Sequence, residues 1–356
     1  MEKYIEETSR SVKSRVGKNP VLLLISGGVD STVAGALLLK IFGGDQVHLM
    51  YFDTGLMRKN ETAGVCAILE KLGAENIHIV KAEDEFLSAL KGKSEPEEKR
   101  KIIGDLFISI QEREVARLGL PENYFLAQGS IRADFIESGL ADNNRADNNE
   151  ADNSGTDISR SDKCGAAKKT SAQTNVIKSH HNAASPLVIA KREAGKILEP
   201  LAQFYKNEVR ELGRFLGLDD EVVNRHPFPG PGLAVRILGE VTKEKCDILR
   251  EADAIFIDEL KNRRSASGKT LYDEIWQAFA VLLPIRSVGM ANAERRYGNV
   301  VALRAINSSD GMTANVYPFE IRDLLEISSR ITSSVKEVGR VTYDISGKPP
   351  ATIEWE

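Results

Sequence analysis

Short apolar runs alternate with longer amphipathic stretches over the first two hundred residues. The apolar runs predict strands at residues 21–25, 46–52, 77–81 and 124–127, and a further buried strand that starts at about Gln128. The stretches between them predict helices at residues 32–42, 60–72 and 99–119. Because strands that alternate with helices build parallel sheets, this part of the chain predicts an α/β fold.

A strong boundary signal follows a predicted amphipathic helix at residues 205–216. The seven residues from His226 to Gly232 contain three of the twelve prolines of the chain. Such punctuation predicts two domains, at residues 1–228 and 229–356. The second is expected to be a smaller α+β domain, with strands at residues 234–238, 287–290, 300–305 and 340–345 and helices at residues 243–262 and 318–337.

Residues 141–175 interrupt the first domain. Ile158 is their only large aliphatic residue and they contain no aromatic one, so they cannot build a core. Aspartates recur every fifth residue from Asp142 to Asp162, a period that fits neither a helix nor a strand. The glycine and the closing glutamate of a calcium loop are missing. We therefore expect a flexible, low-complexity insertion here.

The overall composition is that of an ordinary globular protein, with 42% hydrophobic and 28% charged residues and a net charge of −4 over 356 residues. No basic run with interleaved aromatic residues predicts a nucleic-acid partner. No apolar stretch could span a bilayer and residues 1–10 offer no signal peptide, so we expect a cytoplasmic protein without a membrane partner. Cys66, Cys164 and Cys246 are too widely separated for a disulfide framework or a CxxC pair.

The strongest candidate for chemistry is the segment Ser26-Gly27-Gly28-Val29-Asp30-Ser31-Thr32, between a predicted strand and a predicted helix. Its glycines allow a tight turn, its hydroxyls donate hydrogen bonds, and the helix N-terminus favours anions, so it predicts a phosphate loop. Asp30 would repel a bare phosphate, which predicts a bridging Mg²⁺ ion. The spacing fits neither a Walker A loop nor a dinucleotide fingerprint. The alternative is a glycine turn with a helix cap and no ligand.

The Ser-Gly-Gly-x-Asp-Ser pattern resembles the loop of the N-type ATP pyrophosphatases, which adenylate a carbonyl or carboxyl oxygen and release pyrophosphate. The resemblance implies ATP as co-substrate and Asp30 as the Mg²⁺ ligand. It implies catalytic roles for Ser26, Asp30, Ser31 and Lys178. The residues that it implies as ATP contacts are Ser26, Gly27, Gly28, Val29, Asp30, Ser31, Thr32, Phe52 and Lys178. The motif alone does not choose among the superfamily members.

Further segments resemble the GMP synthetase family in particular. They are Phe52 to Arg58, Gln128 to Ser138, Ile177 to Asn182, His226 to Gly232 and Lys348 to Glu356. Two consecutive prolines in the last segment preorganise it, and the lysine and carboxylate around them suit an anionic nucleotide. The resemblance implies contacts with xanthosine monophosphate (XMP) from Arg58, Asp134, Arg236, Lys348, Thr352, Ile353 and Glu354.

The family resemblance implies a ligase that forms a C–N bond. ATP would adenylate the C2 oxygen of XMP, and ammonia would then displace AMP to give GMP. No cysteine lies in the nucleophile elbow of a glutamine amidotransferase, so the chain is expected to accept free ammonia, or ammonia from a separate glutaminase subunit as in two-subunit members of the family. A homodimer is also implied. Two departures are Ala291-Asn292-Ala293, where the family has a Gly-Asp pair, and Ala133, where a proline is common.

Three other functions compete with this hypothesis. A related adenylating enzyme such as NAD synthetase would use nicotinic acid adenine dinucleotide in place of XMP. A non-catalytic nucleotide-binding protein would not need Ser26, Asp30 and Lys178 together. A tRNA-thiolating enzyme is disfavoured by the acidic net charge and the absence of a cysteine pair. His180 and His181 lie on opposite faces of an extended segment, which favours structural roles over a shared metal.

Overall fold

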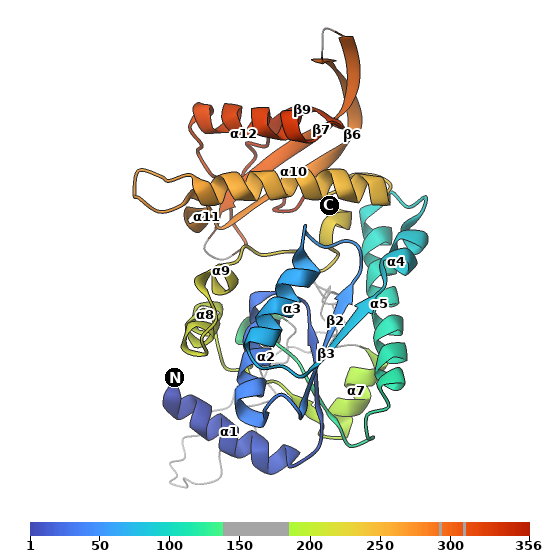
Figure 1. Cartoon of the computed structure of the whole chain (residues 1–356), viewed down its shortest axis with the longest axis vertical. Coiled ribbons are helices and arrows are strands. Elements are labelled where there is room, and N and C mark those ends of the chain that lie inside the picture. The colour runs from blue at the N-terminus through green and yellow to red at the C-terminus, as the bar shows by residue number, and fades with distance from the viewer. Residues whose placement is uncertain (138–184, 292–293, 309–310) are drawn as a thin grey trace, which may run out of the picture.

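The computed structural model describes residues 1–137, 185–291, 294–308 and 311–356 (Figure 1). Its first part is built on a five-stranded parallel sheet with the strand order β3-β2-β1-β4-β5. The strands are β1 (Val21–Ile25), β2 (Val47–Asp53), β3 (Asn76–Lys81), β4 (Phe125–Ala127) and β5 (Ile197–Leu198). The predicted α/β class is confirmed. The predicted insertion at 141–175, together with Lys178, His180 and His181, lies outside the described residues.

Helices cover both faces of this sheet because successive strand residues point to opposite sides. Leu22 of β1 packs into one apolar cluster, whereas Val21 and Leu23 pack into another. The helices on the second face are α1 (Glu2–Val16), α2 (Val29–Phe42), α3 (Glu61–Lys71) and α8 (Lys206–Phe215). The other face is covered by α4 (Glu83–Leu90), α5 (Pro96–Leu118) and α7 (Pro186–Glu193). The short helices α6 (Arg132–Glu137) and α9 (Asp220–Val223) belong to the connections.

The last part of the chain is a smaller α+β unit, as predicted. Its strands are β6 (Gln277–Ala291), β7 (Glu294–Asn307), β8 (Asn315–Val316) and β9 (Val338–Tyr343). β7 pairs antiparallel with β6 and β8 and parallel with β9. Helices α10 (Lys243–Asn262), α11 (Leu271–Glu274) and α12 (Ile321–Ser334) accompany this sheet, and α10 lies between it and the parallel sheet (Figure 1). One apolar cluster runs through both units, from Leu22 to Val338.

Two predicted strands are wrong. Residues 234–238 do not form a strand: the chain turns through the 3₁₀-helix η3 (Gly232–Val235), and only Ile237 makes an isolated bridge, with Leu282. Residues 234–237 of this run are buried, and periodicity cannot separate a buried strand from a buried turn. The strand expected from Gln128 is also absent from the described residues, because β4 ends at Ala127 and α6 follows.

The division at residue 228 stays a prediction, although every strand of the parallel sheet precedes that residue and every strand of the second sheet follows it. No helix within the described ranges is both long and apolar enough to cross a membrane.

Candidate functional site

The predicted phosphate loop connects β1 to α2 and is held by its own hydroxyl groups. The Ser26 N–H donates to Ser31 Oγ at 3.2 Å, and the Gly28 N–H donates to Ser26 Oγ at 3.3 Å. Thr32 Oγ1 donates to the Gly28 carbonyl at 2.8 Å. These bonds curl the loop over the start of α2, whose first-turn N–H groups have no acceptors within the helix. The arrangement can receive an anion.

Two glycines allow later segments to approach this loop. Gly27 has φ of +78°, and a Cβ atom there would lie 2.9 Å from Glu61 Oε1 and 3.0 Å from Val65 Cγ2 of α3. A Cβ atom on Gly129 would lie 3.0 Å from the Ser31 backbone. The Gln128-Gly129 motif therefore packs directly against the loop, as expected for parallel strands whose carboxyl ends meet at one edge.

Asp30 forms an ion pair that the sequence did not reveal. Both of its carboxylate oxygens accept hydrogen bonds from Lys206 Nζ, at 2.6 and 2.8 Å. Lys206 is the first residue of α8, and Arg210 follows one turn later. Burial lowers the pKa of Arg210, and the nearby Asp30 carboxylate opposes this shift. The phosphate loop thus lies beside two cationic side chains of α8.

A third cation, Arg225, also holds the loop. Its Nη1 donates to the Gly27 carbonyl at 2.9 Å, and its Nη2 pairs with the Glu61 carboxylate. The Glu61 side chain is only 5% exposed. Arg225 therefore fixes the left-handed turn at Gly27 and joins the loop to α3, and it precedes the proline-rich segment directly.

A second polar cluster lies where the two units meet, and it contains predicted XMP residues. Arg236 is completely buried and donates from Nε and Nη2 to the Glu354 carboxylate, at 2.9 and 2.8 Å. Gln277 Nε2 donates to the same carboxylate at 2.8 Å. The Arg236 guanidinium also lies 4.1 Å from the Phe279 ring centre. The structure therefore brings Arg236 and Glu354 together across 118 residues of sequence.

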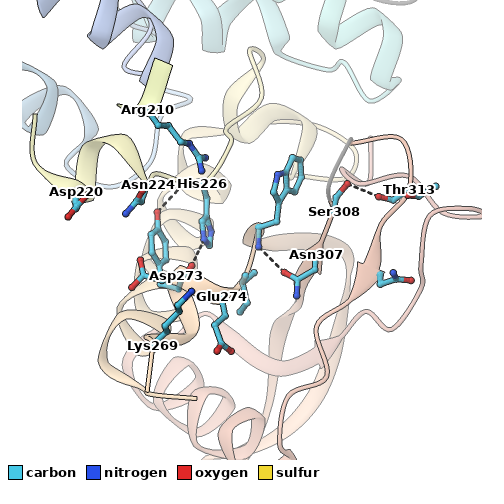
Figure 2. Close-up of a pocket in the computed structure, with 14 residues that line it drawn as sticks. Arg210, Asp220, Asn224, His226, Lys269, Asp273, Glu274, Asn307, Ser308 and Thr313 are labelled. Atoms are coloured by element: carbon cyan, nitrogen blue, oxygen red, sulfur yellow. Dashed lines mark hydrogen bonds between the residues drawn. The ribbon is translucent and has the colours of Figure 1, made fainter. Parts of the chain in front are cut away.

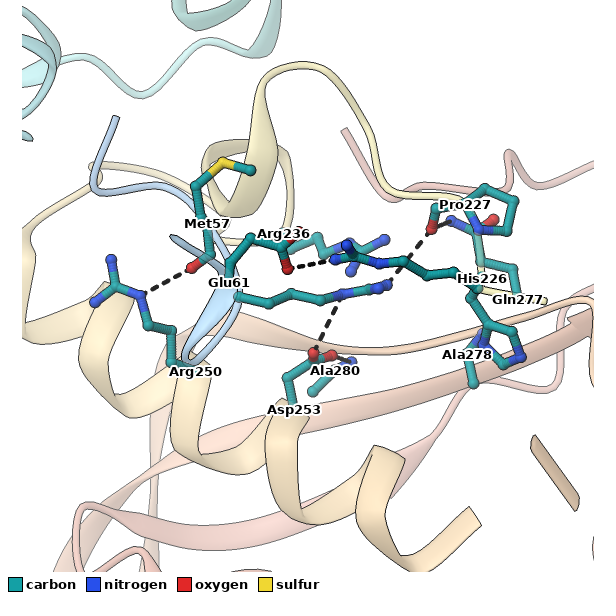
Figure 3. A network of polar contacts seen from close by, with 12 residues as sticks. Met57, Glu61, His226, Pro227, Arg236, Arg250, Asp253, Gln277, Ala278 and Ala280 are labelled. Carbon is teal, nitrogen blue, oxygen red and sulfur yellow. Dashed lines mark hydrogen bonds and ion pairs between the residues drawn. The ribbon is translucent and has the colours of Figure 1, made fainter. Parts of the chain in front are cut away.

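Arg58 lies in the same junction, beside Arg236 and Asp253, which are labelled in Figure 3. Its side chain is 12% exposed, its Nε is 3.8 Å from the Asp253 carboxylate, and its guanidinium stacks over the Phe228 ring at 4.7 Å. Burial lowers the pKa of Arg58, and Asp253 partly opposes this. Arg58 Nε and Arg236 Nη1 are buried without a hydrogen-bond acceptor. Buried guanidinium donors without acceptors are costly, so the junction is suited to an anionic ligand.

The tail from Lys348 to Glu356 is anchored through its backbone as well as through its side chains. Arg304, completely buried, donates to the carbonyls of Thr352 and Ile353 at 2.7 and 2.8 Å. Lys348 Nζ donates to the Gly311 carbonyl at 2.8 Å. The tail residues of the predicted XMP set thus lie on one anchored segment.

The remaining predicted residues lie elsewhere. Asp134 is on α6, where its carboxylate accepts the Ile131 N–H at 2.9 Å. Phe52 is 4% exposed and packs on Phe107, with ring centres 4.7 Å apart. Their contacts with XMP and ATP stay predictions, and so does the contact of Lys178, which lies outside the described residues.

A cavity of about 850 Å³ opens beside this junction (Figure 2). It is lined by Arg210 and His226 from one unit and by Tyr272 and Trp276 from the other, among other residues. His226 stacks on Tyr272 with ring centres 3.8 Å apart. Burial is the main cause that lowers the pKa of His226 to about 4, so its imidazole is neutral near pH 7. No pattern in the sequence predicts this cavity, because its walls meet only in the folded chain.

Comparison with known proteins agrees with the motif interpretation. Residues 264–355 match the family "GMP synthase C terminal domain", and residues 2–106 match the family "NAD synthase". The chain is 45% identical over its full length to a GMP synthase [glutamine-hydrolyzing] of Wolbachia pipientis wMel and 43% identical to that of Zymomonas mobilis. A relative from Thermotoga petrophila is 45% identical over 99% of the chain. The predicted resemblance to the GMP synthetases is confirmed. The chain spans 61%, 60% and 62% of the length of these curated relatives.

Proposed function

Because this chain is related to the GMP synthases along its entire length, we propose that it is a C–N ligase that converts XMP to GMP at the expense of ATP. The observation that carries the proposal is the pair of adjacent anion sites. A phosphate loop faces Lys206, and a buried junction holds Arg58 and Arg236 with donors that lack acceptors. A related adenylating enzyme such as NAD synthetase remains the alternative, since residues 2–106 match that family.

On the ATP side, we assign the β- and γ-phosphates to the loop from Ser26 to Thr32. The N–H groups at the start of α2 would bind phosphate oxygens. Lys206 is paired with Asp30 at 2.6 Å and would also face the phosphates, where it offsets the charge of the departing pyrophosphate. Lys178 is proposed as a further phosphate contact.

Asp30 is the proposed protein ligand for Mg²⁺. Within the described ranges, no three His, Cys, Asp or Glu side chains gather as a ready-made metal site. That fits an ion bound through one carboxylate and the substrate phosphates. Such an ion would supply positive charge beside the pyrophosphate. Because both Asp30 oxygens already accept from Lys206, ion and lysine would share this carboxylate.

On the XMP side, Arg58 is proposed to bind the nucleotide phosphate and Glu354 the N–H groups of the base. Arg236 would hold Glu354, and the other proposed contacts are Asp134, Lys348, Thr352 and Ile353. The C2 oxygen of XMP would attack the α-phosphorus of ATP, and the bond to pyrophosphate would break. Ammonia would then attack C2, AMP would leave with that oxygen, and a proton would be released. The protein contributes mainly positioning and charge.

Ammonia is proposed to come from a glutamine amidotransferase partner. The relatives are named as glutamine-hydrolyzing, and the chain matches about 60% of their length. Burial raises the pKa of both described cysteine thiols, that of Cys246 to about 11. Neither Cys66 nor Cys246 is therefore suited to act as a thiolate nucleophile.

We also propose a homodimer formed through the second domain, residues 229–356. Several large apolar side chains of that domain are exposed on the β6–β7 hairpin and on α12. They are Ile285, Val288, Met290, Tyr297, Ile321 and Leu325. Exposed apolar groups of this size are typical of an interface.

The proposal is tested with purified chain, ATP, Mg²⁺ and XMP, with ammonium or glutamine as nitrogen source, and GMP, AMP and pyrophosphate measured by chromatography. Equimolar GMP, AMP and pyrophosphate are expected with ammonium, and none with glutamine alone. Turnover with nicotinic acid adenine dinucleotide but not with XMP would replace the proposal by its alternative. Lys206→Met should reduce turnover about a hundredfold. Lys71→Met removes a similar exposed lysine–aspartate pair outside the site and should not reduce it.

A further inference from the structure

Lys99 is a lysine whose side chain has no solvent exposure. It lies in the first turn of α5, and its Nζ donates to three backbone carbonyls of one segment. These are the carbonyls of Ala234 at 2.9 Å, Ile237 at 2.9 Å and Gly239 at 3.2 Å. Burying an ammonium is costly unless it is bound on all sides, so this side chain fixes the course of residues 234–239.

The same ammonium also pairs with the carboxylate of Glu356. The Glu356 side chain is 8% exposed, and its Oε1 accepts the Gly239 N–H at 3.3 Å. Two residues earlier, Glu354 is bound by Arg236, which lies between the Ala234 and Ile237 carbonyls. One amino group therefore touches the segments that carry both members of the Arg236–Glu354 pair.

We propose that Lys99 is a positioning residue for the XMP-binding tail. By binding Glu356 and the carbonyls on both sides of Arg236, it sets the place of the Glu354 carboxylate before the nucleotide arrives. Lys99 does not touch the nucleotide itself. The inference rests on the proposed function, in which this tail recognises XMP, and it adds that a helix of the first domain organises the tail.

The first test compares the kinetics of Lys99→Met with those of the unmodified chain. The KM for XMP should rise about tenfold, while the KM for ATP should change by less than about twofold. Only the tail, which is the proposed XMP-binding segment, is no longer held in position in this variant. Glu356→Gln should show a smaller effect in the same direction. The double variant should be no worse than Lys99→Met alone, since both changes break one contact.

Lys191→Met is the matched control. Lys191 is also buried, and its Nζ donates to the Glu122 and Tyr124 carbonyls, each at 3.0 Å. Its loss should lower stability without raising the KM for XMP relative to that for ATP. An equal KM shift in Lys191→Met and Lys99→Met would reduce Lys99 to a general structural residue and overturn the inference.

A second measurement is independent of catalysis. The chain has two tryptophans, and Trp355 lies in the tail between Glu354 and Glu356. In a Trp276→Phe background, acrylamide quenching of the fluorescence of Trp355, whose side chain is 36% exposed in the anchored tail, should increase by up to about twofold in Lys99→Met and Glu356→Gln but not in Lys191→Met. Unchanged quenching in both tail variants would refute the anchoring. Increased quenching in a chain that does not use XMP would instead refute the proposed function while the anchor stands.

Discussion

Protonation of His226 should destabilise the folded chain, because its ring is held as a neutral imidazole. The ring is 4% exposed, and its Nε2 lies 2.8 Å from the Tyr272 carbonyl, to which it donates. Its Nδ1 accepts the Ala278 N–H at 3.1 Å. A second proton would have to occupy Nδ1, where it would face that N–H and break the bond.

The size of the effect follows from the pKa. Burial lowers the pKa of His226 from 6.5 to about 4, whereas the unfolded chain keeps the ordinary value. The unfolded state therefore binds the proton first as the pH falls, and stability is lost between about pH 6.5 and about pH 4. The loss should be about 1.4 kcal/mol at about pH 5.5 and about 2.5 kcal/mol at about pH 4.5. Above about pH 7, His226 should contribute no pH dependence.

Urea unfolding of the unmodified chain and of His226→Gln, from about pH 7.5 to about pH 4.5, measures this directly. Glutamine keeps a donor toward the Tyr272 carbonyl and does not titrate. The other four histidines are present in both proteins, so their contributions cancel in the difference. The difference between the free energies of unfolding of the two proteins should change by about 2.5 kcal/mol as the pH falls, because only the unmodified chain loses stability through protonation of His226. Parallel curves across this range would refute the buried, neutral state of His226.

Two further predictions concern the loop and the junction. Gly232→Ala should destabilise the chain by about 3 kcal/mol, because φ is +64° and the new Cβ would lie 2.3 Å from the Leu56 carbonyl oxygen. Gly217→Ala, with φ of +86° and no atom within 4 Å, should cost only about 1 kcal/mol, measured for both variants by urea unfolding. Glu61→Gln should raise the KM for ATP about tenfold, because Arg225 loses the carboxylate that orients its guanidinium toward the phosphate loop. An unchanged KM for ATP would show that this ion pair does not contribute to the ATP site.

Local patterns predicted the regular elements well and the irregular ones poorly. The helix at residues 243–262 was predicted to the residue, because its apolar stripe continues over five turns. Helix α1 is missing from the predicted elements, because residues 1–10 were considered only as a possible signal peptide, although Ile5 packs into the core. The prediction of a strand at residues 234–238 was wrong because buried apolar residues show no alternation of apolar and polar positions, from which a strand could be told apart from a turn.

The site divides in the same way between local and distant residues. The phosphate loop could be predicted because its glycines, hydroxyls and carboxylate are neighbours in the sequence. The contacts of Lys206 and Arg225 could not be predicted, because these residues are separated in sequence from Asp30 and Gly27 by 176 and 198 positions. Nothing in the spacing of a lone lysine or arginine reports such a contact, and only the packing of α8 and of the segment before the prolines creates it. The partner of Asp30 is therefore a finding of the structure.

The proline-rich segment explains how two motifs far apart in sequence make one junction. Gly232 allows the backbone to approach Leu56 so closely that the Leu233 N–H donates to the Leu56 carbonyl at 2.7 Å. Arg58 lies two residues after this contact and Arg236 three residues after Leu233, so one backbone bond holds the two arginine-bearing segments together. The prolines before Gly232 restrict the chain to this path at little entropic cost. A change at Gly232 that still folds should therefore weaken XMP binding more than ATP binding, because the phosphate loop is held separately by Arg225.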